Sequence, residues 1–136
     1  MRATIKALLA LLASAGWQAY YGDATGADSY PYVLLWGTPG SDDVEPTLAD
    51  DDAWSDLLGV TVVDDTALNT VGSAQQVRDL LDGLVVPVDS RHVQVHLRRS
   101  LGQTVQPDRD VTIPGTNTHP CFMVDRYLLV SQHVPF

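Results

Sequence analysis

The sequence predicts an α+β fold in which a single mixed, mostly antiparallel sheet of five to six strands is packed by two helices. Two observations lead to this class. Residues 58–63 (LGVTVV) are rich in β-branched side chains, which suit a largely buried strand, and residues 73–84 then repeat apolar side chains at helical spacing. A helix with one apolar stripe buries that stripe against a neighbouring sheet. The chain is therefore expected to form one sheet and one helical layer.

The length of the chain bounds its domain organisation. We expect one domain over residues 1–136, because a chain of 136 residues has the size of a single domain. Such a chain buries about two-thirds of its extended-state surface, enough for a core without disulfides. The single cysteine, Cys121, excludes an internal disulfide, as is usual in a reducing compartment.

The N-terminal segment admits two interpretations. One face of a helix that Gly16 would end carries the apolar residues Ile5, Leu8, Leu9 and Leu12. The basic residues Arg2 and Lys6 before an apolar run, followed by Ala13-Ser14-Ala15, also resemble a secretory signal. We expect the helix, because the chain retains Met1 and the run is far shorter than the ~20 residues that span a bilayer.

Two short aromatic segments, residues 17–21 and 30–36, predict the first two strands. The second contains Pro31, which has no N–H to donate and therefore belongs at the start of a strand or on an edge. A turn-rich connection joins the two segments.

Residues 38–56 form the longest region without a clear pattern, and they are rich in acids. Loops beyond about 15 residues are uncommon in compact domains and are usually functional or disordered. We expect a short helix at residues 53–58, capped by Asp51 or Asp52, with Trp54 anchoring the acidic loop.

The central helix has marked ends. Ser73 and Gln76 have the spacing of a capping box at its start, and Gly83 tolerates the positive φ needed where a helix ends. Its apolar face consists of Val77, Leu80, Leu81 and Leu84. Three residues remain alternatives as the cap of an earlier first turn: Asp65, Thr66 and Thr70.

The C-terminal half predicts the remaining strands. Apolar and polar residues alternate in residues 91–99, which predicts a strand with one solvent-exposed face. Residues 103–113 predict another strand, interrupted by a proline. Residues 121–132 are apolar on both faces apart from Asp125 and Arg126, so we place this strand centrally in the sheet.

The charge of the chain is strongly negative and unevenly placed. Seventeen acids against eight bases give a net charge of −9, which argues against nucleic-acid phosphate as the main partner. No Lys or Arg occurs from Ala7 to Val77, whereas eleven acids lie between Asp23 and Asp65. One interpretation is a solvated acidic loop beside a mixed remainder. The other is two oppositely biased surfaces that dock head to tail on copies of the chain, as in a closed ring.

Three groups of residues have the composition of a chemical site without its geometry. His92 and His96 have the spacing of a zinc pair on a helix, but a strand would separate them by about 13 Å, too far for one ion. The pair His119 and Cys121 lacks the electropositive setting of a nucleophile, because the cysteine opens an apolar strand. The acids at 50–52 with Asp56 lack the spaced oxygens, glycine and closing glutamate of a calcium loop. We therefore expect no metal and no cofactor.

Sequence motifs for chemistry are missing as well. The chain contains no G-x-S-x-G, Walker A or G-x-G-x-x-G motif. It also has no basic stripe interleaved with aromatics for single-stranded nucleic acid. We therefore expect no catalytic residue, and a structural or binding module in place of an enzyme.

A series of short segments occurs along the chain in a fixed order. After a leading helix come Tyr20-Tyr21-Gly22, Pro31-Tyr32-Val33-Leu34-Leu35, Val60-Thr61-Val62-Val63, Val77-Arg78-Asp79-Leu80-Leu81 and Val124-Asp125-Arg126-Tyr127. In this order they resemble the tail terminator proteins of long-tailed, non-contractile (siphovirus-type) actinobacterial phages. The resemblance covers most of the chain except the acidic loop at 38–56, which matches no element of that family.

This resemblance implies a small subunit that forms a hexameric ring in the virion, at the head-proximal end of the tail. The ring would cap the tube of the major tail tube protein, stop its polymerisation and present a surface to the head-tail connector or neck protein. DNA would pass through the lumen without specific binding, which suits an acidic chain. The protein would be made in the host cytoplasm and would have no membrane partner.

The residues expected to make contacts lie in the acidic loop at 38–56 and on the polar side of the strand predicted at residues 91–99. They are Asp42, Asp43, Asp50, Asp51, Asp52, Trp54, His92, His96, Arg98 and Arg99. Buried anchors should supply most of the binding energy, since exposed ion pairs contribute only about 0–1 kcal/mol each. Two alternatives remain: another head-tail neck or completion protein and, in a different class, a small secreted binding protein or hydrolase.

Overall fold

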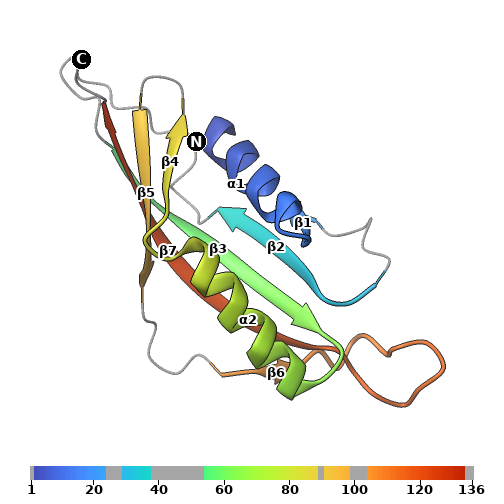
Figure 1. Ribbon diagram of the computed structural model, residues 1–136. Coiled ribbons are helices and arrows are strands. Elements are labelled where there is room, and N and C mark those ends of the chain that lie inside the picture. The colour runs from blue at the N-terminus through green and yellow to red at the C-terminus, as the bar shows by residue number, and fades with distance from the viewer. Residues whose placement is uncertain (1, 24–28, 38–53, 89–90, 99–103, 134–136) are drawn as a thin grey trace.

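The computed structural model of the protein describes residues 2–23, 29–37, 54–88, 91–98 and 104–133. Within these ranges it has two helices, α1 (Arg2–Ser14) and α2 (Ala67–Leu81). The strands are β1 (Gln18–Tyr21), β2 (Tyr32–Gly37), β3 (Trp54–Asp64), β4 (Val85–Val88), β5 (Arg91–Arg98), β6 (Gln106–Pro107) and β7 (Cys121–His133). The predicted α+β class, one sheet packed by two helices, is confirmed (Figure 1).

The strands form one mixed sheet in the order β1-β2-β3-β7-β5-β4, and the two-residue β6 adds to β7. The β1–β2 pair is parallel and every other pair is antiparallel, as predicted for a mostly antiparallel sheet. The long strands β3 and β7 pair over eleven residues, from Trp54 opposite Ser131 to Asp64 opposite Cys121. The central position predicted for the 121–132 strand is confirmed, because β7 lies between β3 and β5.

Both helices cover the same face of the sheet (Figure 1). Helix α2 lies on β3, β7 and β5, whereas α1 contacts β1 and β4, which are the two edges of the sheet. Since one helix touches both edges, the sheet curls around α1. The enclosed core consists of Ile5, Leu8, Leu12, Val33, Leu35, Leu58, Val60, Val62, Ala74, Val77, Leu81, Val93, Val95, Tyr127 and Leu129.

The chain ends its helices as the sequence predicts. Gly16 follows α1 with a φ of 93° and Gly83 follows α2 with a φ of 80°, a backbone conformation that side chains disfavour. Two of the apolar residues predicted for the central helix, Val77 and Leu81, are buried in the core. Among the described residues, neither helix is long and apolar enough to span a membrane.

The start of α2 differs from the capping box predicted at Ser73. Thr66, one of the alternatives, is the N-cap, and its hydroxyl accepts a hydrogen bond of 3.1 Å from the backbone N–H of Asn69. Ser73 lies two turns inside the helix and donates a 2.7 Å hydrogen bond to the Asp64 carboxylate. A serine followed three residues later by glutamine resembles a cap, but here its hydroxyl serves a tertiary contact.

Two other local predictions are wrong. The expected helix at 53–58 is strand from Trp54 onward, because β3 finds hydrogen-bonding partners in β7 along its whole length. The predicted strand at 103–113 is limited, within residues 104–113, to Gln106–Pro107. Beyond it the backbone forms turns, in which Ile113 N–H donates to Thr118 and Asp108 N–H donates to Pro120.

Candidate interaction surface

Strand alternation places half of the sheet residues on the face opposite the two helices, here called the open face. Its rows follow from the register of β2, β3, β7 and β5. It comprises Tyr32, Leu34, Trp36, Leu57, Gly59, Thr61, Val63, His92, Gln94, His96, Arg98, Phe122, Val124, Arg126, Leu128 and Val130. Apart from Val63, which is buried, its apolar side chains are half-buried, and its basic side chains are exposed, so the face offers both apolar area and charge.

Trp36 lies flat across the open face over Gly59. A Cβ atom on Gly59 would overlap the Trp36 ring, so only glycine admits the indole at this place. The indole Nε1–H donates a 3.0 Å hydrogen bond to the Thr61 hydroxyl, and the Arg126 guanidinium lies 5.9 Å from the ring centroid. Three neighbouring strands therefore hold one aromatic ring in a fixed orientation at the surface.

Two arginines face each other beside this ring. Arg98 of β5 is directly opposite Arg126 of β7, and both side chains are exposed. Like charges in register repel each other across a sheet. Among the described residues the one ion pair within 4 Å is Arg78–Asp125, on the other face, and no described strand residue of the open face is acidic. The positive charge of this row is therefore not neutralised within the described part of the chain.

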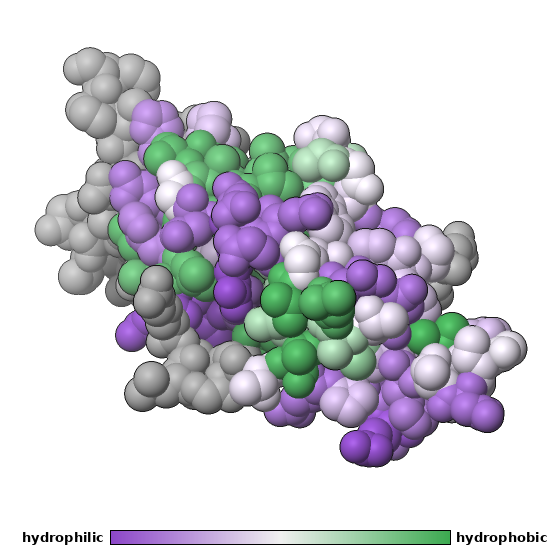
Figure 2. All heavy atoms as spheres, turned by 60° about the horizontal axis from the view of Figure 1, so that its bottom comes forward, coloured by the Kyte–Doolittle hydropathy of each residue, from purple (hydrophilic) through white to green (hydrophobic). Residues whose placement is uncertain are grey.

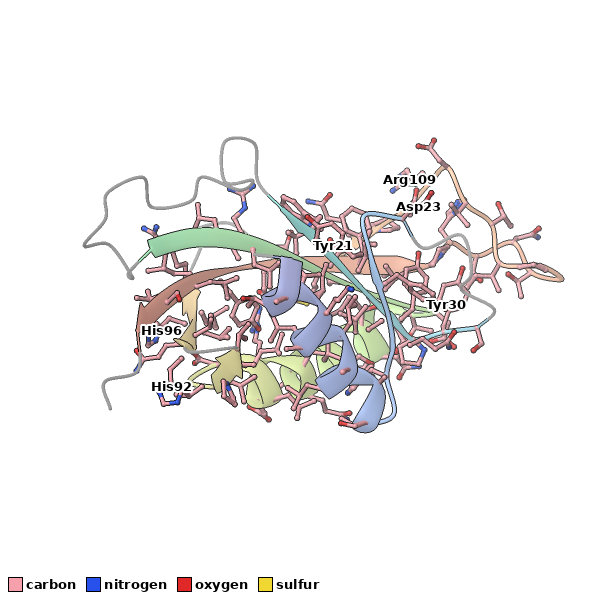
Figure 3. The ribbon with its side chains drawn as sticks, turned by 90° about the horizontal axis from the view of Figure 1, so that it is seen from above. Tyr21, Asp23, Tyr30, His92, His96 and Arg109 are labelled. Atoms are coloured by element: carbon pink, nitrogen blue, oxygen red, sulfur yellow. The ribbon has the colours of Figure 1, made fainter. Side chains whose placement is uncertain are left out.

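Figure 3 shows that the two ends of the sheet differ in character. His92 and His96 lie at one end, where His96 Nε2 is 3.2 Å from the Gln94 amide oxygen. Tyr30 lies at the other end, where its ring stacks on Tyr32 at 5.9 Å. Burial, then the neighbouring Tyr30 and Asp108, raise the pKa of the Tyr32 phenol. The open face thus carries basic side chains toward one end and aromatic side chains at the other.

The covered face has its own polar groups, and most of them are paired internally. Arg78 of α2 donates two hydrogen bonds, of 2.8 and 2.7 Å, to the buried Asp125 carboxylate, and these bonds raise the pKa of the guanidinium. The Tyr127 and Ser131 hydroxyls are buried, and neither has a hydrogen-bond partner in the described structure. Burial raises the pKa of Tyr127 far above its ordinary range.

The residues predicted to make contacts fall into three groups. His92, His96 and Arg98 are exposed together on one side of β5, as the alternation predicted. Trp54 begins β3 and so belongs to a strand and not to a loop, although its side chain lies outside the described part. The others also lie outside the described residues: Asp42, Asp43, Asp50, Asp51, Asp52 and Arg99.

The groups considered for chemistry are separate in the structure. His92 and His96 lie four residues apart along strand β5. Cys121 is buried, as predicted, and the nearby His119 directs its Nδ1 to the Val111 carbonyl oxygen at 2.6 Å. Within the described ranges, no group of three or more His, Cys, Asp or Glu side chains is placed to hold a metal ion.

Two features of the surface were not predicted. Trp36 and Arg126 form a pair only because β2, β3 and β7 are neighbours, which single-strand patterns do not reveal. Leu68 and Val71 are 83% and 46% exposed on the outer side of α2. They were not predicted to be on a helix, because the predicted helix began only at Ser73. The signal that could have found them is the Thr66 alternative, since it places both residues on one stripe of a longer helix.

Comparisons with known proteins give information about the fold of the chain and none about its activity. No protein-family model matches the chain, and no curated protein matches it. A solved structure superimposes with a TM-score of 0.61 at 15% sequence identity, covering 99% of this chain and 94% of that chain. That protein carries a name that states no activity, and at this identity the likeness concerns the fold. The same arrangement of helices and strands therefore exists in an independently folded chain of similar length.

Proposed function

We propose that the protein is a structural subunit of a phage virion, of the tail terminator kind. It forms a ring at the head-proximal end of the tail tube, ends the growth of the tube and joins the tail to the head-tail connector. The open face is the observation that carries this proposal. A sheet face with half-buried apolar side chains and exposed cations, in a chain of net charge −9, suits an acidic protein partner.

The segments that resemble tail terminators support the proposal by where they lie. Residues 60–63 are on β3, residues 77–81 end α2 and residues 124–127 are on β7, and these three elements pack together. The Arg78–Asp125 ion pair joins two of these segments directly. The segments thus form one structural unit at the centre of the domain.

In this proposal the protein works by surface complementarity and has no catalytic residue, metal or cofactor. Its partners are further copies of itself in a hexameric ring, the major tail tube protein and the connector. DNA passes through the ring without specific binding, because a net negative ring repels phosphate. No membrane partner is required.

The proposal is tested by locating the chain in a particle. We expect antibody or gold label on a tagged chain to mark one point on the tail, next to the head. Deleting the gene should yield tubes of uncontrolled length, because nothing stops the polymerising tube protein. A tag on the tube protein, which should label the whole tail, is the control.

Other label positions have distinct meanings. Particles without the chain, or with the chain along the tube, contradict the proposal. Label inside the neck, with tubes of normal length after deletion, would favour another head-tail completion protein.

A further inference from the structure

Helix α2 presents a second exposed surface, on the side of the domain away from the open face. Leu68, Val71, Gln75 and Asp79 follow one another at spacings of three and four residues and are all exposed. We call this line the outer stripe. Its first half is apolar and its second half is polar, ending in the carboxylate of Asp79. Figure 2 shows the molecule tilted so that the bottom of Figure 1 faces the viewer, and separate apolar patches interrupt the polar surface there.

The exposure of the outer stripe is unusual for its composition. Leu68 is 83% exposed although it occupies the second position of a well-capped helix. The opposite side of α2 already fills the core with Ala74, Val77 and Leu81, so the outer stripe does not contribute to the described core. An apolar pair that the described part of the domain leaves exposed is available to a partner.

We propose that the outer stripe of α2 in one copy docks on the open face of the next copy. This inference rests on the proposed ring and assigns the two surfaces that build it. Asp79 then approaches the Arg98–Arg126 row, and the apolar half of the stripe packs further along β7, where Val71 reaches Val130. The contact neutralises the repulsion between two arginines in register and covers apolar area on both sides.

The dimensions of the two surfaces agree. Eight residues of helix separate Val71 from Asp79, about 12 Å at 1.5 Å per residue. On β7, four residues separate Arg126 from Val130, about 13 Å at 3.3 Å per residue. A stripe laid along β7 with its carboxylate at Arg126 therefore brings Val71 to Val130, with Gln75 near Leu128 and Leu68 beyond Val130.

The direction of the two surfaces decides the kind of assembly. The outer stripe and the open face lie on opposite sides of the same sheet, so a contact between them is heterologous. Such a contact leaves one free surface of each kind after every addition, and it produces a closed ring or an open filament, never a closed dimer. This geometry is the one that a ring-forming subunit requires.

Single charge reversals test the contact. Arg98→Glu and Asp79→Arg each place like charges across the proposed contact, and each side chain is exposed, so the fold should tolerate both. We expect each variant to weaken self-association about tenfold or more, measured by sedimentation velocity with the wild-type chain beside it. Lys6→Glu on α1 and Asp110→Arg after β6 are matched controls at exposed positions outside both surfaces, and they should leave association unchanged.

A mixture gives the more specific result. Equal amounts of the Arg98→Glu and Asp79→Arg chains can alternate, because every contact between unlike copies again joins opposite charges. We expect association to return in this mixture, whereas either reversal variant alone, at the same total concentration, should not associate. Oxidation of mixed Val71→Cys and Val130→Cys chains should also cross-link them, and Lys6→Cys with Val130→Cys should not.

The outcomes separate this contact from the function that it deepens. Rings that tolerate both reversals, or reversals that do not rescue each other, overturn the contact and leave the tail terminator role intact. If wild-type chains bind neither to one another nor to the tail tube, both the contact and the tail terminator role are wrong. If Arg98→Glu lowers only the binding of duplex DNA, the open face binds a nucleic acid and the contact is likewise wrong.

Discussion

The two faces of the sheet are built from the same strands and are completed differently. On β7, Tyr127 and Leu129 point into the helical layer and are fully buried, while their neighbours Leu128 and Val130 are only half-buried on the open face. The alternation of the strand is the same on both sides. What differs is that two helices complete the first face and that, among the described residues, no helix covers the second.

The charges of the two sides differ in the same way. On the helical side, Asp125 binds Arg78, Asp64 accepts a hydrogen bond from Ser73, and Asp82 accepts one from the Leu97 N–H. On the open face, the two arginines in register have no described carboxylate. These three acids on the helical side are paired within the domain, whereas the two arginines of the open face are left in a row, so their charge is available to a binding partner.

The largest expected difference between the faces is in stability. Leu129→Ala removes a fully buried side chain and should lower the free energy of unfolding by about 2–5 kcal/mol. Leu128→Ala, one residue away on the open face, should cost less than about 1.5 kcal/mol because this side chain is already partly hydrated. Urea denaturation followed by circular dichroism measures both. Equal losses would mean that the open face is covered as completely as the other.

The two kinds of arginine give the next comparison. Asp125→Ala leaves Arg78 without its carboxylate and should cost about 2–3 kcal/mol, less than a fully buried pair because the Arg78 side chain is 29% exposed. Arg98→Ala should change stability by no more than about 0.5 kcal/mol, since it removes only an exposed cation. Thermal unfolding of both variants tests the difference. A large loss for Arg98→Ala would show that this row serves the fold.

Gly59→Ala examines the open face by itself. The added methyl group would overlap the Trp36 ring, which must move, and overpacking of this kind costs about 1–3 kcal/mol. The displaced indole should also lose its hydrogen bond to Thr61, so its N–H resonance should shift in an NMR spectrum. Gly72→Ala, at an open position on α2, is the control and should have no such effect. An unshifted Trp36 resonance would contradict the close packing described for this ring.

The buried Tyr127 hydroxyl tests how completely the covered face is satisfied. Since it has no described hydrogen-bond partner, Tyr127→Phe should leave stability unchanged or raise it by about 1 kcal/mol. Ser131→Ala should behave in the same direction for the same reason. A loss above about 1 kcal/mol in chemical denaturation would indicate that an internal water molecule binds this hydroxyl.

Local patterns in the sequence predicted what depends on one strand or one helix, and they failed where a distant partner decides. The alternation of residues 91–99 placed His92, His96 and Arg98 on one side of a strand, because side-chain direction along a strand needs no neighbour. The 53–58 segment was predicted as a helix from its acidic cap, but pairing with β7 overrides that preference. The Trp36–Arg126 contact spans three strands, so it required the strand order.

The smallest expected effect concerns the acids of the helical side. Hydrogen bonding, first from the Asn69 amide at 2.9 Å, lowers the pKa of Asp65 from its ordinary value of 3.8. A lowered pKa means that the ionised group favours the folded state above pH 3.8, and this contribution is lost as the pH falls through the folded pKa. Asn69→Ala should raise the Asp65 pKa toward 3.8 in an NMR titration, and Gln75→Ala, which frees Asp79, should leave it unchanged. If Asn69→Ala has no effect, the helical-side acids are not held by their donors, and the contrast with the unpaired arginines of the open face loses its physical basis.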